Sequence, residues 1–248
     1  MRTLIFDLWG EWGHFRKYYS TSSPLTFSVI PPTAVFGVVG AILGLEKEGD
    51  QYLKILRQAD TLVGVGLRKP VKKSTLGLNL INTKGNVWVP KRRKEGARTQ
   101  IRTEFLREPG FRLFVSMKDP DLYGELVERV QGHRPFYTLS LGLSELLANF
   151  VYVGEADVFK GSAAGEPVEM DSIIPMGLIR QKGIPFTEGK RYKKERMPLA
   201  IDDNRVVTSY AECLFETQGS GIQAEVDHFW EGEGTRFVFL NEKEWTDG

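Results

Sequence analysis

The segment from residue 14 to residue 45 constrains the fold most, since two prolines in it join a polar, aromatic stretch to an apolar helix. It reads HFRKYYSTSSPLTFSVIPPTAVFGVVGAILGL. Pro31 and Pro32 favour a first helical turn, where the amide hydrogen that proline lacks would have no partner. Residues 25–29 are predicted to be extended, because a residue before proline disfavours the helical conformation. We therefore expect a loop, a short extended stretch and then a helix.

The predicted helix carries small residues along one face. Gly37, Gly40, Ala41 and Gly44 recur at offsets of 0, 3, 4 and 7 residues, which is the spacing of a single helical face. Each interior glycine costs roughly 1 kcal/mol relative to alanine, so a close contact should compensate. Two interpretations stay open: close packing of this helix on a sheet, or approach of a nucleic-acid backbone or a partner subunit.

Charge is distributed unevenly along the chain. The net charge of the 248 residues is +1, but residues 68–107 hold 12 Lys/Arg and 2 Asp/Glu, which leaves the remainder at −9. Such an asymmetry indicates an anionic partner. Within this block, residues 83–103 read as a projecting β-hairpin or arm with its basic run, Lys91 to Lys94, near the tip. A solvated surface loop without function is the alternative interpretation.

The apolar pattern predicts an α+β fold. Alternation predicts strands over 2–9, 61–67, 71–81, 111–115 and 150–159, and amphipathic spacing predicts helices over 49–59 and 120–130. This order begins a βαββαβ ferredoxin-like (RRM-like) unit. Beyond about residue 160, short β-like segments are expected over 173–179, 197–201, 205–215 and 235–240. We therefore predict a ferredoxin-like domain at 1–160, carrying the basic β-hairpin, and a smaller C-terminal β-rich lobe at 161–248.

Few side chains suggest catalysis or metal binding. His14, beside Arg16, Lys17 and Tyr18, is the only arrangement typical of a metal-independent ribonuclease, which needs a general acid and base near neutral pH. A lone histidine beside a basic patch is more often an RNA contact or a structural residue. The acidic residues around His228 match no recognised metal-site spacing. No P-loop, Rossmann fingerprint or HExxH motif occurs, so we expect no metal and no cofactor, and catalysis by His14 stays an open alternative at this point.

Three features bear on the compartment. The single cysteine, Cys213, excludes an intrachain disulfide, fits a reducing cytoplasm, and is predicted to be a buried small apolar residue. The longest apolar run, residues 34–45, is too short to span a bilayer. No secretory signal pattern opens the sequence. We expect a cytoplasmic protein with no membrane partner.

Two stretches carry a resemblance to a known family. Residues 15–45 resemble the amino-terminal signature of the CRISPR-associated Cas five family, part of the repeat-associated (RAMP) superfamily. PFYTLSLGLSELLANF at 135–150 is similar to that family's run of proline, aromatic and then Leu-Gly. The resemblance covers most of the first 150 residues. It implies a ferredoxin-like fold with an inserted β-hairpin thumb, which the basic arm at about 83–103 would be.

The resemblance also implies a role. The family's subunit in Cascade binds the 5′ handle of crRNA, caps one end of the backbone filament, and touches the large subunit near the protospacer-adjacent motif of target DNA. Phosphates would meet the cations, splayed bases would stack on Tyr18 or Tyr19, and Trp88 could act as a wedge. The RNA-binding residues that we expect are His14, Arg16, Lys17, Tyr18, Tyr19, Ser20, Lys72, Lys73, Trp88, Lys91, Arg92, Arg93, Lys94, Arg98 and Arg102.

One branch of the family cleaves repeat RNA with tyrosine, lysine and histidine. The lysine–histidine pair of that branch has no counterpart here, since no histidine lies between residues 14 and 133. We therefore predict a non-catalytic member, most like the type I-B variety. A metal-independent endoribonuclease that processes repeat RNA is the alternative, and a generic RRM-like protein that acts alone is a third possibility.

Overall fold

A computed structural model describes residues 1–20, 23–81, 98–163, 165–202 and 204–242, and most of the described chain outside loops is strand. The helices are α1 (Pro32–Leu43), α2 (Gln51–Gln58) and α3 (Pro120–Gln131), with 3-10 turns η1 (Glu48–Asp50) and η2 (Met176–Leu178). The strands of the first part are β1 (Arg2–Gly10), β2 (Trp12–Gly13), β3 (Leu62–Leu67), β4 (Lys73–Ile81), β5 (Arg98–Arg107), β6 (Gly110–Ser116) and β7 (Ala148–Asp157). Those that follow are β8 (Phe159–Gly161), β9 (Val168–Met170), β10 (Ile174–Pro175), β11 (Tyr192–Ile201), β12 (Val207–Glu216), β13 (Ile222–Ala224), β14 (Phe229–Gly232) and β15 (Thr235–Phe237).

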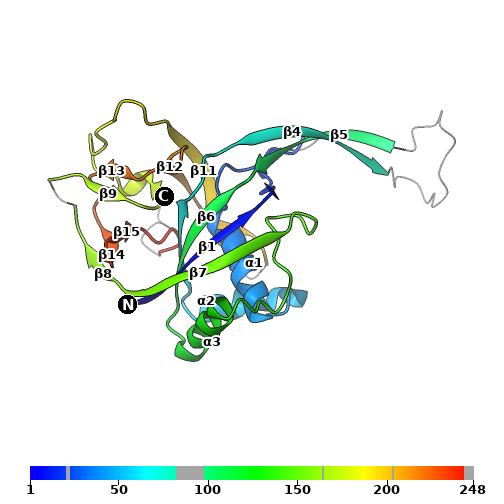
Figure 1. The fold of residues 1–248 in the computed structure, drawn as a ribbon, viewed down its shortest axis with the longest axis horizontal. Coiled ribbons are helices and arrows are strands. Elements are labelled where there is room, and N and C mark those ends of the chain that lie inside the picture. Colours follow the sequence, from blue (N-terminus) through cyan, green and yellow to red (C-terminus); the bar gives the residue numbers. More distant parts are fainter. Residues whose placement is uncertain (21–22, 82–97, 164, 203, 243–248) are drawn as a thin grey trace.

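A four-stranded sheet in the order β3-β6-β1-β7 forms the centre of the molecule, and all its neighbouring strands are antiparallel. Alternation along β1 gives the sheet two apolar faces. Leu4, Phe6 and Leu8 belong to the large core cluster that includes the helices, whereas Ile5 packs with Phe237 from the C-terminal part. Figure 1 shows α1, α2 and α3 gathered on one side of this sheet.

The glycine face of α1 packs against a helix and a loop. A Cβ on Gly40 would lie 3.2 Å from the Cβ of Tyr52 in α2, and Gly44, at φ 77°, lies against Phe136. A Cβ on Gly37 would meet nothing within 4 Å. The interpretation of close packing is therefore correct for Gly40 and Gly44, but the partners are α2 and the segment after α3 rather than a sheet.

The strands β4 and β5 form a long antiparallel hairpin. The pairing runs from Lys73↔Leu106 to Ile81↔Arg98, and in Figure 1 the two strands project away from the remainder of the molecule. The hairpin therefore begins before residue 83 and ends after residue 103, the limits predicted for it from the sequence. Residues 82–97, which include Trp88 and the basic run at 91–94, lie outside the described residues.

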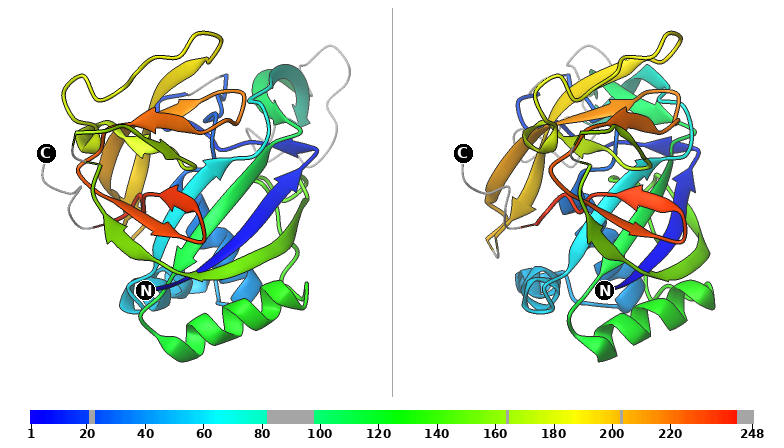
Figure 2. Two further views of the ribbon diagram at one scale, coloured as in Figure 1. Left: turned by 60° about the vertical axis from the view of Figure 1, so that its left-hand side comes forward. Right: turned by 90° about the vertical axis from the view of Figure 1, so that its left-hand side faces the viewer.

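The part beyond residue 160 packs directly on the central sheet. The ring of Phe114 in β6 stacks on Phe237 with centroids 4.1 Å apart. The amide of Leu240 donates a hydrogen bond to the carbonyl of Val63, at 2.8 Å. Figure 2 shows the late strands, in yellow to red, alongside the central sheet. The core is therefore continuous across residue 160, and a domain boundary there stays a prediction.

Some predicted elements differ from the observed ones. The helix expected over 49–59 is divided into η1 and α2. The strand expected over 173–179 is only Ile174–Pro175 followed by η2, because Pro175 lacks the amide hydrogen needed to continue a strand ladder. No helix in the described part of the chain has the length and apolar character needed to cross a membrane.

Candidate nucleic-acid interface

The segment after β2 folds back on itself beside the base of the hairpin. The amide of Lys17 donates to the carbonyl of Leu25, at 2.8 Å, and Arg16 forms an isolated antiparallel bridge with Thr26. The amide of Glu104 in β5 donates to the carbonyl of Pro24, at 2.9 Å. The turn leaves Tyr18 and Tyr19 on the surface, with 55% and 57% of their area exposed.

Two of the expected RNA ligands in this segment are buried. His14 is 5% exposed, and its Nδ1 donates to the backbone carbonyl of Glu104, at 2.7 Å. The hydroxyl of Ser20 donates to the carbonyl of Lys17, at 2.7 Å. The side chain of Arg16 is exposed, and its Nη2 donates to the carbonyl of Ser20, at 2.9 Å. The contact of Ser20 closes the turn, whereas that of His14 joins the segment to β5. A direct role of either residue in RNA binding stays a prediction.

Lys17 and Glu195 form a buried ion pair. Lys17 Nζ lies 2.5 Å from Glu195 Oε1, and the two side chains are 12% and 5% exposed. The amide of Ser28 donates to Glu195 Oε2, at 2.8 Å. Burial alone would raise the pKa of Glu195, but the hydrogen bonds from Lys17 and Ser28 and the charge of Lys193 together hold it below its ordinary value. Burial likewise opposes the charge of Lys17, yet its contacts with Glu195 and Tyr19 raise its pKa overall.

Two lysines at the base of the hairpin also form ion pairs with nearby acids: Lys72 just before β4, and Lys73, the first residue of β4. Lys72 Nζ lies 2.8 Å from Glu108, and Lys73 Nζ lies 2.9 Å from Glu104 and donates to the carbonyl of Thr26. Burial lowers the pKa of Lys73, although Glu104 acts in the opposite direction. These acids compete with phosphate for both ammonium groups.

Further along the hairpin, Arg98 and Arg102 of β5 are exposed and lie four residues apart on one face of the strand. The structure therefore brings exposed arginines and two exposed tyrosines to the same hairpin and its base. The remaining expected ligands, Trp88, Lys91, Arg92, Arg93 and Lys94, lie outside the described residues, so their contribution stays a prediction.

A ring next to Tyr18, and a guanidinium that lies over that ring, were not among the expected ligands. The ring of Tyr210 in β12 lies 5.2 Å from that of Tyr18, and the guanidinium of Arg196 in β11 lies 5.0 Å above the Tyr210 ring. The sequence pattern over residues 205–215 predicts a strand, and so predicts on which face of that strand Tyr210 lies. Nothing in the sequence, however, places that strand next to residue 18.

Among the described residues, Cys213 and His228 have contacts typical of structural side chains. Cys213 is fully buried, and burial raises the pKa of its thiol. His228 Nε2 lies 3.0 Å from the carboxylate of Glu242, which also accepts a hydrogen bond from Trp230 Nε1. Within the described ranges, no group of three or more His, Cys, Asp or Glu side chains could hold a metal ion.

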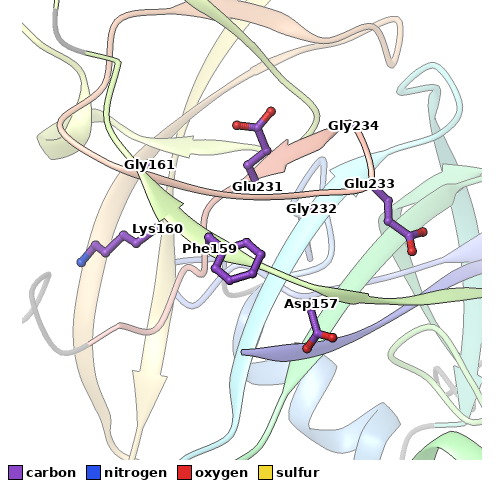
Figure 3. A pocket seen from close by; sticks show the side chains of 8 residues that line it. All are labelled: Asp157, Phe159, Lys160, Gly161, Glu231, Gly232, Glu233 and Gly234. Atoms are coloured by element: carbon purple, nitrogen blue, oxygen red, sulfur yellow. The ribbon is translucent and has the colours of Figure 1, made fainter.

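A cavity of about 450 Å³ lies between the β7–β8 junction and the β14–β15 turn (Figure 3). Asp157, Glu231 and Glu233 contribute carboxylates to its lining, and Lys160 contributes the single cation. The net negative lining does not suit a phosphate backbone. The interface candidate therefore remains the hairpin and the exposed tyrosines at its base.

The architecture defines a mainly β protein whose helix-covered antiparallel sheet carries a projecting hairpin. The chain belongs to the family described as CRISPR-associated protein (Cas_Cas5), whose family model matches residues 3–205. This membership agrees with the resemblance seen in residues 15–45 and 135–150.

Solved structures show the same fold. A CRISPR protein from Archaeoglobus fulgidus has a TM-score of 0.56 at 17% identity, covering 96% of this chain and 99% of that one. A chain of a CRISPR RNA-guided surveillance complex has a TM-score of 0.50 at 12% identity, covering 88% and 91% of the two chains. No match was found among curated proteins.

Proposed function

We propose that this chain is a crRNA-binding subunit of a type I CRISPR Cascade interference complex. It would bind the 5′ handle of crRNA and cap the backbone filament next to the large subunit. Membership in the CRISPR-associated family carries this proposal. It is supported by the fold shared with a chain of an RNA-guided surveillance complex. The exposed rings of Tyr18 and Tyr19 and the exposed arginines of the hairpin, Arg98 and Arg102, also support it.

We also propose that the central sheet has the ferredoxin-like (RRM-like) topology. Without the β4–β5 hairpin, the chain order is β1, α1 with α2, β3, β6, α3 and β7, which is the βαββαβ order of that fold. The hairpin joins the two middle strands of this order and corresponds to the thumb. A thumb carrying Arg98 and Arg102 would meet the sugar-phosphate backbone of the guide.

We further propose that the subunit does not cleave RNA. Metal-independent cleavage needs a general base that can reach the ribose hydroxyl. His14 is buried and its Nδ1 is bonded to a backbone carbonyl. His133 stacks on Phe150, with centroids 4.5 Å apart, and His228 contacts Glu242. None of these positions favours a histidine acting on RNA bound at the hairpin.

The test uses the purified chain and repeat RNA from the CRISPR array of its own genome. Incubation without metal should leave the RNA intact on a denaturing gel, while a fluorescently labelled 5′-handle RNA should bind more tightly than a scrambled one. Specific cutting at the repeat would support the endoribonuclease alternative. In that event, the paired substitutions His14→Ala and Tyr18→Phe should abolish cleavage and retain binding. Failure to bind handle RNA would contradict the proposal.

The proposed partners follow from the same role. They are the crRNA, the backbone and large subunits and, next to the large subunit, target DNA near the protospacer-adjacent motif, all in the cytoplasm. Co-expression with a neighbouring backbone-subunit gene should yield a complex that copurifies with crRNA. A backbone filament that assembles equally well without this chain, with the handle equally protected, would argue against the capping role.

A further inference from the structure

Four side chains from distant parts of the sequence form one surface, which we term the aromatic platform: Tyr18, Tyr19, Arg196 and Tyr210. The rings of Tyr18 and Tyr19 meet edge to face, with centroids 5.2 Å apart. Tyr18 lies at the same distance from Tyr210, whose ring lies under the guanidinium of Arg196. More than half of Tyr18 and of Tyr19 is open to solvent, so a planar ligand could reach them.

A buried ion pair beneath the aromatic platform links two of the segments that carry its side chains. Lys17 precedes Tyr18, Glu195 precedes Arg196, and the buried ion pair between them joins the two segments. Lys193 Nζ adds a hydrogen bond to the hydroxyl of Ser28, at 2.6 Å. Because the ion pair fixes the neighbouring backbone, little ordering is left for a ligand to impose, and such preorganisation favours binding.

The chemistry of the platform suits an unpaired nucleobase. Unstacked bases in single-stranded RNA stack on aromatic rings and on guanidinium planes, and both are present here. Arg196 and Arg16 are exposed cations within this part of the surface, where a phosphate next to the stacked base would lie. The exposed acid on this face of β12, Glu212, is paired with Lys194 at 2.8 Å, which reduces its repulsion of RNA.

We propose that the aromatic platform binds an unpaired base of the crRNA handle, and that Tyr210 and Arg196 of the C-terminal strands are base-binding residues. This inference rests on the proposed function and assigns to strands beyond residue 190 a part in RNA binding. A base bound there would contact both the turn that carries Tyr18 and Tyr19 and the strands β11 and β12.

The test places 2-aminopurine, a fluorescent base, at successive positions of a synthetic 5′-handle RNA. Binding to the wild-type protein should quench at least one position by stacking. Tyr210→Ala should remove that quenching and weaken the affinity roughly 5- to 100-fold, without changing its salt dependence, because no charge is lost. Tyr210→Phe should retain both the quenching and the affinity. Tyr137→Ala, which removes a partly exposed tyrosine elsewhere, is the matched control and should have no effect.

Tyr18→Ala is the second variant. Tyr18 lies in an exposed turn, so this variant should fold even if Tyr210→Ala does not, and the same measurements can then be made on it. Wild-type quenching and affinity in the folded variants would overturn the platform, while the proposed function would stand if the wild type still binds the handle. If the variants no longer copurify with the backbone subunit but still bind RNA as the wild type does, the platform is a protein interface, and this result would also overturn its role in binding a base. A wild-type protein that does not bind handle RNA would refute both.

Discussion

Lys17 and Glu195 make a 2.5 Å ion pair that is almost wholly removed from solvent, and it joins the first segment of the chain to β11. Removing one partner of a buried pair leaves an uncompensated charge. Glu195→Gln should therefore lower the free energy of unfolding by about 3 kcal/mol, measured by urea denaturation. Glu212→Gln is the matched control, because its pair with Lys194 is half exposed on both sides, and it should cost less than about 1 kcal/mol. Equal effects would show that the burial of Glu195 is unimportant.

The same pair predicts a pH dependence. The pKa of Glu195 in the folded chain lies below its ordinary value of 4.5, so its stabilisation is complete above that value and is lost as the pH falls through the folded pKa. The pKa of Lys17 is raised in the folded chain. The stabilisation that comes from its charge is therefore complete below the ordinary lysine pKa of 10.5 and is lost only as the pH rises through the pKa of the folded chain. The stability difference between wild type and Glu195→Gln should thus be constant between about pH 5 and pH 9, and it should shrink as the pH falls below the ordinary value and through the lowered pKa of Glu195. A difference that grows on acidification would contradict this assignment.

The glycines of α1 provide opposite predictions on a single helix. Gly37→Ala adds a methyl group where nothing lies within 4 Å, so it should raise stability by up to about 1 kcal/mol. Gly44→Ala combines φ 77° with a Cβ that would lie 2.5 Å from Phe136 Cγ, and it should cost about 1–3 kcal/mol or more. Thermal unfolding measures both. Loss of RNA or subunit binding in a stable Gly37→Ala variant would revive the interpretation of that face as a contact surface.

The basic run at 91–94 should contribute through its charge. Replacing all four residues by alanine should weaken handle RNA binding and flatten its salt dependence, since each lost phosphate contact lowers the logarithmic slope by about 0.7 for a single strand. Fluorescence anisotropy at several salt concentrations provides the measurement. Alanine at Lys54, Lys118, Arg129 and Arg134, near the helices, is the charge-matched control. An unchanged slope in the arm variant would tell against the arm as an RNA contact.

Much of the fold could be predicted because local rules decided it. Pro31 and Pro32 fixed the start of α1, and Asp119 caps α3 by accepting hydrogen bonds from the amides of Asp121 and Leu122. The alternation in β1 and β6 reflects burial on two faces. The failures have equally local causes, since the proline in β10 stops a ladder that hydrophobicity alone would have extended.

The candidate site was less predictable, because a side chain's role depends on its neighbours in space. Lys17, Lys72 and Lys73 look like phosphate ligands in the sequence, yet each faces a carboxylate. Tyr210 was not recognised, since its strand is identifiable but the partner of that strand is not.

The sequence by itself determined the family, the main elements and the concentration of positive charge between residues 68 and 107. These depend on composition, spacing and short-range backbone preferences, all of which are written along the chain. Only the tertiary structure decided which cations remain exposed, that Tyr210 lies beside Tyr18, and that Arg196 lies over the Tyr210 ring. Ion pairing and ring contact depend on distances of a few ångströms between segments that the chain's folding alone brings together.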